Sequence, residues 1–142
     1  MTISPINSYI NPHKNLNNPK IQEKILRLKE IDAHVKAHEA AHKAAGGSLA
    51  GAAHYTYVTG PDGKKYAVAG EVPIAIKKGN TPEETIANME IVKAAALAPS
   101  DPSPQDLKVA ATAEMIENQA RMKLNQQKLH FEKKGNHINI LV

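Results

Sequence analysis

The feature that most constrains this chain is one long stripe of apolar residues that begins near residue 20. Its members recur at alternating spacings of four and three residues, as on one face of an α-helix: Ile21, Ile25, Leu28, Ile31 and Val35. The same count continues to His38 and His42, so two histidines extend the buried side of this helix. Gly46-Gly47 then ends it, because glycine readily adopts the left-handed conformation that follows a helix. We therefore expect one helix from Pro19 or Lys20 to Gly46.

The two histidines belong to the pattern H-E-x-x-H, which residues 38 to 42 spell as HEAAH. Positions four apart on a helix share one face, one turn apart, so both imidazoles can bind a single Zn²⁺. Glu39 follows the first histidine, where a carboxylate can take a proton from a metal-activated water. A buried histidine pair without a partner carries a desolvation cost, which a metal ion would offset. The motif therefore indicates a zinc site with His38 and His42 as ligands and Glu39 as the catalytic base.

Composition limits the other classes of protein. The 142 residues suit one domain, and because 42% are hydrophobic but only 4% aromatic, its core must be small and aliphatic. The absence of cysteine excludes disulfides and thiolate metal sites, and leaves His, Glu and Asp as ligands. The net charge of +4 comes from lysines spread along the chain with few aromatics among them, so no nucleic-acid partner is expected. No apolar run reaches the ~20 residues of a membrane span, and no secretory signal is seen, so a cytoplasmic location is expected.

The remaining segments predict a small α+β domain. Residues 1–19, rich in Asn, Pro and Ser, are expected to be a flexible leader, residues 20–132 the domain, and residues 133–142 a short strand or loose tail. A β-hairpin is expected from strands at 54–58 and 64–69 around the turn residues Pro61-Asp62-Gly63. Thr81, Pro82 and Glu84 have the order of an N-cap, first helical residue and capping box, and predict a second helix. A third helix is expected from Ser103-Pro104 to about His130, with an apolar face formed by Val109, Ala113, Ile116 and Ala120.

Several blocks of the sequence resemble the SprA-related family of bacterial metalloproteases. They are HEAAH, the block GPDGKKYAVAGEV at residues 60–72, and DPSPQD at residues 101–106, in the order that the family has them. The resemblance covers roughly residues 30 to 121 and leaves out the leader and the tail. It implies a zincin-type peptidase, and it does not carry a substrate with it.

A catalytic zinc usually has a third protein ligand, and Glu71 is the expected one. It lies in the family-like Gly-Glu-Val block, directly after a hairpin that can fold back over the helix. A His₂Glu site of gluzincin type would result, although gluzincins usually supply this glutamate from a helix and Glu71 falls at the end of a strand. Glu84, Glu90 and His54 stay open as alternatives, and Glu84 already has a structural role in the capping box.

Other residues near the motif have both a structural and a functional interpretation. His34 shares the histidine face, but it lies about 12 Å from His42 along a helix axis, too far for both to bind one ion. The tyrosines at 55, 57 and 66 are favoured as cross-strand packing, the alternative being an oxyanion-stabilising phenol. Asp101 and Asp106 could orient a ligand histidine, although helix capping is sufficient to explain Asp106.

The sequence thus predicts a zinc metallopeptidase that acts on peptides or proteins, in which Glu39 activates water and returns the proton to the leaving nitrogen. Two alternatives remain. The first is a metal-binding or protein-interaction module without turnover, because so small a chain leaves little room for a deep cleft. The second is a basic helical adaptor in which the motif is a coincidence.

Overall fold

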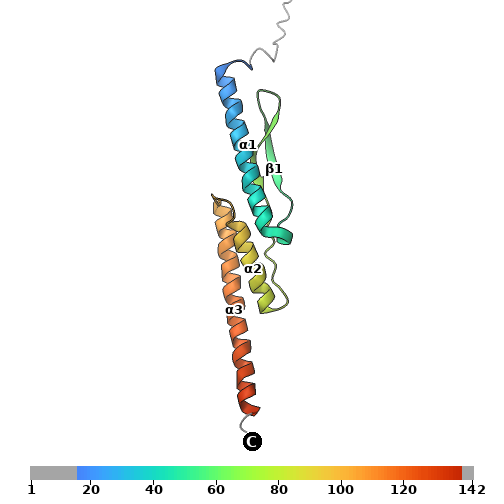
Figure 1. The fold of residues 1–142 in the computed structure, drawn as a ribbon, viewed down its shortest axis with the longest axis vertical. Coiled ribbons are helices and arrows are strands. Elements are labelled where there is room, and N and C mark those ends of the chain that lie inside the picture. The colour runs from blue at the N-terminus through green and yellow to red at the C-terminus, as the bar shows by residue number, and fades with distance from the viewer. Residues whose placement is uncertain (1–15, 139–142) are drawn as a thin grey trace, which may run out of the picture. The chain divides into compact units, whose positions relative to one another are not determined.

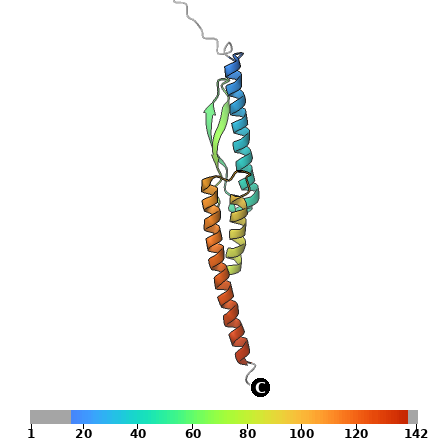
Figure 2. The same cartoon turned by 90° about the vertical axis from the view of Figure 1, so that its left-hand side faces the viewer.

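The computed structural model describes residues 16–138, and the side chains of residues 16–135. The order of elements is α1 (Pro19–Gly46), the short 3₁₀ helix η2 (Gly47–Leu49), β1 (His54–Thr59), β2 (Lys65–Glu71), α2 (Pro82–Ala96) and α3 (Pro104–Ile138) (Figures 1 and 2). This order confirms the predicted α+β class. None of the helices in the described residues has the length and apolarity needed to cross a membrane. The described residues form two compact units, 16–36 with 55–70, and 37–54 with 71–138.

The first unit joins the N-terminal part of α1 to the antiparallel hairpin β1–β2, which lies alongside this helix (Figures 1 and 2). Ile25 is buried as expected, whereas Ile31 is 36% exposed. The neighbouring Asp32 points to the hairpin instead, and its Oδ1 accepts the backbone N–H of Ala67 at 2.8 Å. This hydrogen bond, with that of Lys36, holds the pKa of Asp32 below its usual range. A carboxylate on α1 therefore binds an N–H group of β2 directly.

The hairpin forms at the predicted turn. Gly60 donates its N–H to the carbonyl of Lys64 at 2.8 Å, and Gly63 has φ +77°, a conformation that favours glycine. Both strands run slightly further than expected, to Thr59 and Glu71. The sequence therefore predicted this element nearly to its ends.

The second unit is built around α2 and α3, which lie side by side (Figures 1 and 2). Met89 and Val92 of α2 and Ala113 of α3 are fully buried in its core, and the residues packed against them are Leu49, Ile74, Val109 and Ile116. The apolar face predicted for α3 is thus confirmed. Beside this core Glu117, 4% exposed, is paired with Lys93 and Arg121.

The end of α1 belongs to this second unit, and small residues bring it close to α2. A side chain at Gly46 would bring its Cβ to 2.7 Å from the Cβ of Ala50 and 3.4 Å from that of Ala95, so only glycine fits this contact. Gly47 then has φ +52°, which confirms the predicted helix stop. The last turns of α1, which carry the HEAAH motif, are therefore held against the C-terminal end of α2.

The third helix is longer than predicted. It continues past His130 to Ile138, so residues 133–138 are helical and not a strand or a loose tail. Lys, Gln, Glu and Leu are good helix formers, and the single Gly135 costs only about 1 kcal/mol, too little to end the helix. The predicted leader falls largely on residues 1–15, which lie outside the described residues together with residues 139–142.

Candidate metal centre

The histidines of the HEAAH motif face each other on α1. Their Nε2 atoms are 3.1 Å apart, and the two rings meet edge to face with centroids 4.7 Å apart. His42 is 3% exposed and His38 is half-buried. The one-turn spacing therefore does bring two metal-binding nitrogens together, as predicted from the motif.

The third group that meets them is the carboxylate of Asp106, on the first turn of α3. Its Oδ2 lies 3.3 Å from Nε2 of His38 and 3.2 Å from Nε2 of His42. Among the described residues, these three form a group whose ligand atoms all lie within 4.8 Å of one another. The carboxylate beside the two histidines is thus supplied by α3.

Asp106 is held in place by a reciprocal cap at the start of α3. The backbone N–H of Ser103 donates to Oδ2 of Asp106 at 2.8 Å, and the N–H of Asp106 donates to Oγ of Ser103 at 3.1 Å. Burial favours the protonated acid, but these hydrogen bonds and the imidazoles of His42 and His38 outweigh it. The pKa of Asp106 consequently lies below its usual range, and the group is a carboxylate at neutral pH.

The Nδ1 atom of each histidine also has a partner that orients the ring. Nδ1 of His42 lies 2.7 Å from the carbonyl oxygen of Ala95, which can only accept, so this nitrogen carries the proton. Nδ1 of His38 lies 3.3 Å from Oδ1 of Asp101 and is placed to donate to that carboxylate. In the neutral rings, each Nε2 therefore presents a lone pair to the other and to Asp106. Such outer partners are typical of metal-binding histidines.

The distances fit a tetrahedral ion. Bonds of ~2.0 Å to a tetrahedral zinc place its ligand atoms about 3.3 Å apart. The three edges of the triangle formed by the two Nε2 atoms and Oδ2 are 3.1, 3.2 and 3.3 Å. Three lone-pair atoms this close repel one another unless a cation or a proton lies among them. Two neutral imidazoles and one carboxylate are a donor set that zinc accepts.

The motif glutamate is buried as well. Glu39 is 4% exposed as a residue, and among the described residues no fully buried side-chain oxygen lacks a hydrogen-bond partner. The position of Glu39 directly after His38 in the motif is what favours a chemical role for this carboxylate.

The other predicted ligands lie outside the group of three. Glu71 is exposed at the end of β2, and its role as a ligand stays a prediction. Glu84 accepts the N–H of Asn80 at 2.7 Å, one residue before the N-cap Thr81. Its capping role is thus confirmed, with the N–H of Asn80 as the donor in place of that of Thr81. Glu90 is paired with Arg121 at 3.2 Å, and His54 is exposed at the start of β1.

Asp106 was expected at most to orient a histidine. Its sequence context, Ser-Pro-Gln-Asp, is fully explained by helix capping, so no pattern in the sequence distinguishes a capping carboxylate from one that also faces the histidines. Asp101, by contrast, lies where the sequence suggested, against a histidine of the motif.

The tyrosines belong to the hairpin. Tyr66 is 6% exposed and donates its hydroxyl to Asp62, which raises the pKa of Tyr66 to about 12. The rings of Tyr55 and Tyr57 lie 6.1 Å apart on β1. Packing and turn formation account for Tyr66, and an oxyanion role of any tyrosine stays a prediction.

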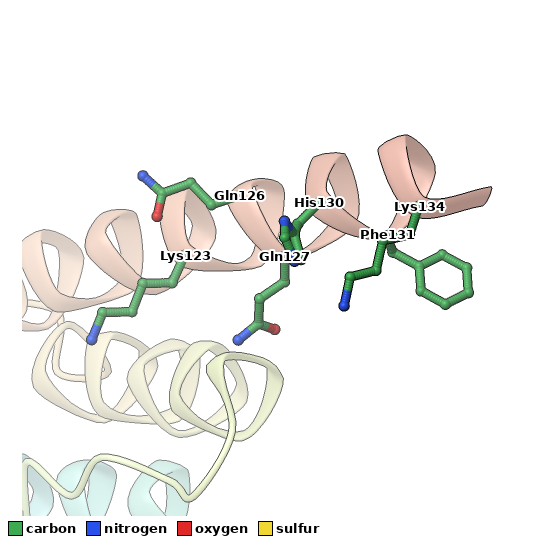
Figure 3. A pocket seen from close by; sticks show the side chains of 6 residues that line it. All are labelled: Lys123, Gln126, Gln127, His130, Phe131 and Lys134. Carbon is green, nitrogen blue, oxygen red and sulfur yellow. The ribbon is translucent and has the colours of Figure 1, made fainter. Parts of the chain in front are cut away.

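A separate hollow lies along the C-terminal part of α3 and contains none of the residues of the metal centre. Figure 3 shows the side chains that line it: Lys123, Gln126, Gln127, His130, Phe131 and Lys134. They are two amides, two lysines, one imidazole and the exposed ring of Phe131, all on a single helix. They include no carboxylate, so this hollow has no ligand set of the kind found at the start of the helix.

Comparison with known proteins identifies one family. The sequence model described as the SprA-related family matches residues 11–141, which is nearly the whole chain. No curated protein and no solved structure matches the chain.

Proposed function

This chain belongs to the SprA-related family, and we propose that it is a zinc-dependent metallopeptidase whose ion is held by His38, His42 and Asp106. The observation that carries the proposal is the triangle formed by the two Nε2 atoms and Oδ2 of Asp106, with edges of 3.1 to 3.3 Å. These edges match the spacing expected between three protein ligand atoms of one zinc ion.

His38, His42 and Asp106 would hold a zinc ion that would supply a Lewis acid, able to acidify a water molecule and to polarise a peptide carbonyl. His38 donates its Nδ1 proton to the carboxylate of Asp101, and His42 donates its Nδ1 proton to the carbonyl of Ala95. Both rings therefore offer an unprotonated Nε2 atom to the ion. Glu39 accepts the proton of the attacking water and transfers it to the nitrogen of the leaving amine. The position of Glu39 directly after His38 in the motif supports this role.

The proposed centre is of the His₂Asp type, with Asp106 in the place that the sequence suggested for Glu71. Asp106 supplies an oxygen 3.2 to 3.3 Å from both histidine nitrogens. The proposed substrates are peptides or proteins, on a zincin-like fold in which the long helix α1 bears the motif. A cytoplasmic location and the absence of a nucleic-acid partner stay predictions from the sequence.

The burial of His42 and Glu39 favours a second candidate, a metal-binding module without turnover. His42 is 3% exposed and Glu39 is 4% exposed, and closed sites of this kind are typical of structural zinc. Turnover separates the two candidates, because Glu39→Gln abolishes peptide cleavage by an enzyme and changes nothing in a structural site.

The first experiment is the metal content of purified protein, measured by mass spectrometry. We expect about one zinc per wild-type chain, none in His42→Ala, strongly reduced zinc in Asp106→Ala, and full zinc in Glu71→Ala and Glu39→Gln. Cleavage of a peptide library by wild type but not by Glu39→Gln then tests the enzymatic part. Wild type that holds no zinc after reconstitution would overturn the proposal.

A further inference from the structure

One oxygen atom has two structural roles in this protein. Oδ2 of Asp106 accepts the N–H of Ser103 at 2.8 Å as part of the cap of α3, and the same atom lies 3.2 and 3.3 Å from the two histidine nitrogens. A carboxylate oxygen has two lone pairs, so Oδ2 can accept the Ser103 N–H with one and bind a metal ion with the other. The cap and the histidines therefore act on one atom from two sides.

We propose that Ser103 is a positioning residue for the metal, so that the N-cap of α3 and the metal centre stabilise each other through Oδ2 of Asp106. This inference rests on the proposed function in one respect, namely that His38, His42 and Asp106 bind zinc. Ser103 itself contributes no ligand atom to the group of three.

The physical reason is the freedom that the cap removes. A short carboxylate side chain can rotate about two bonds, and the loss of this rotational entropy opposes metal binding unless another interaction has already fixed the rotamer. The two hydrogen bonds between Ser103 and Asp106, of 2.8 and 3.1 Å, fix both the side chain and the first turn of the helix that carries it. Loss of such an outer partner typically weakens metal binding by about 10- to 100-fold.

The coupling must act in both directions, because linkage between two equilibria is reciprocal. An ion bound to Asp106 holds the carboxylate in the position that accepts the Ser103 N–H. It should therefore also protect the first turn of α3, whose N–H groups at Asp106 and Leu107 bond to Ser103 at 3.1 and 3.0 Å. A bound ion should thus stabilise the first turn of α3 through Ser103, which does not contact the ion.

The chain contains a matched control at the start of α2. Oγ1 of Thr81 accepts the N–H of Glu84 at 3.1 Å, the same bond and length as that between Ser103 and Asp106. The carboxylate of Glu84, however, does not belong to the metal group. Thr81→Ala therefore removes a cap of equal kind without touching a ligand.

The test is the zinc affinity of purified full-length protein, measured by competition with a chromophoric chelator. Ser103→Ala removes the Oγ that accepts the Asp106 N–H and keeps the backbone N–H that donates to Oδ2. Because one of the two bonds that fix Asp106 is lost, we expect Ser103→Ala to weaken zinc binding by about tenfold, Thr81→Ala to change it less than twofold, and Ser103→Thr to restore it. Ser103→Gly is a second variant that keeps the fold, because glycine is tolerated at an N-cap, and it should also weaken binding.

Hydrogen exchange supplies an independent readout. Zinc should slow the exchange of the Asp106 and Leu107 amides in wild type, and do so much less in Ser103→Ala. If Ser103→Ala and Ser103→Gly bind zinc as tightly as wild type and Thr81→Ala do, the coupling is overturned and the metal centre is left intact. Wild type without any zinc affinity would overturn this inference and the proposed function together.

Discussion

Replacing Asp106 by asparagine should abolish most of the stabilisation that zinc gives to this protein while leaving the helix cap in place. Asparagine has nearly the same shape, and its amide oxygen can still accept the Ser103 N–H that Oδ2 now accepts at 2.8 Å. It lacks the negative charge and is a poor zinc ligand. The substitution therefore separates the two roles of this side chain.

The magnitude follows from linkage. Zinc at 100 times its dissociation constant stabilises wild type by about 2.7 kcal/mol, and for a chain of this size that corresponds to a rise in Tm of roughly 10 °C. Loss of an outer partner of a metal ligand weakens binding by about 10- to 100-fold, and loss of a ligand itself should cost at least the upper value. The same zinc concentration would then only equal the dissociation constant of the variant. The remaining stabilisation is about 0.4 kcal/mol, or a shift of roughly 1 to 2 °C.

The assay is thermal unfolding with and without added zinc, followed by circular dichroism, for wild type, Asp106→Asn and Glu71→Gln. Wild type and Glu71→Gln should show the full shift, and Asp106→Asn a small fraction of it. An unchanged shift in Asp106→Asn together with its loss in Glu71→Gln would refute the assignment of Asp106 and return the ligand role to Glu71.

Three further predictions concern other contacts. Asp101→Ala should weaken zinc binding about tenfold in chelator competition, because it removes the partner of His38 Nδ1 at 3.3 Å; unchanged affinity would show that Asp101 does not orient the ring. Lys93 and Arg121 hold the pKa of Glu117 below its usual value of 4.5, so its contribution to stability is present above that pH and is lost as the pH falls through the lowered pKa. Urea unfolding should therefore show Glu117→Gln to be less stable by about 1 to 2 kcal/mol at pH 7 and nearly equal to wild type in acid, whereas a pH-independent difference would contradict the ion pairs. Absorbance titration at alkaline pH should find one tyrosine with a pKa of about 12, the value of Tyr66, and Asp62→Asn should return it towards 10.0; a tyrosine still at 12 would contradict this cause.

The elements of the fold were predictable because each is specified by local rules. The apolar spacing from Ile21 onwards and the Gly46-Gly47 stop predicted α1, Pro-Asp-Gly predicted the hairpin turn, and Thr81 predicted the start of α2. The end of α3 was missed because no strong stop signal follows His130 and the sequence there is compatible with either a helix or a tail. Where a strong local signal is lacking, the sequence alone does not determine the boundary.

By itself the sequence determined that His38 and His42 share one face of a helix, since a spacing of four residues implies this through helix geometry alone. The third group of the metal centre depended on the tertiary structure. Asp106 comes from another helix, and its context in the sequence is that of an ordinary cap. Only the packing of the end of α1 near α2 and the start of α3 brings its Oδ2 to 3.2 and 3.3 Å from the two histidine nitrogens. Local spacing can predict two ligands on one helix, whereas a ligand from a distant segment is placed by the packing of the core.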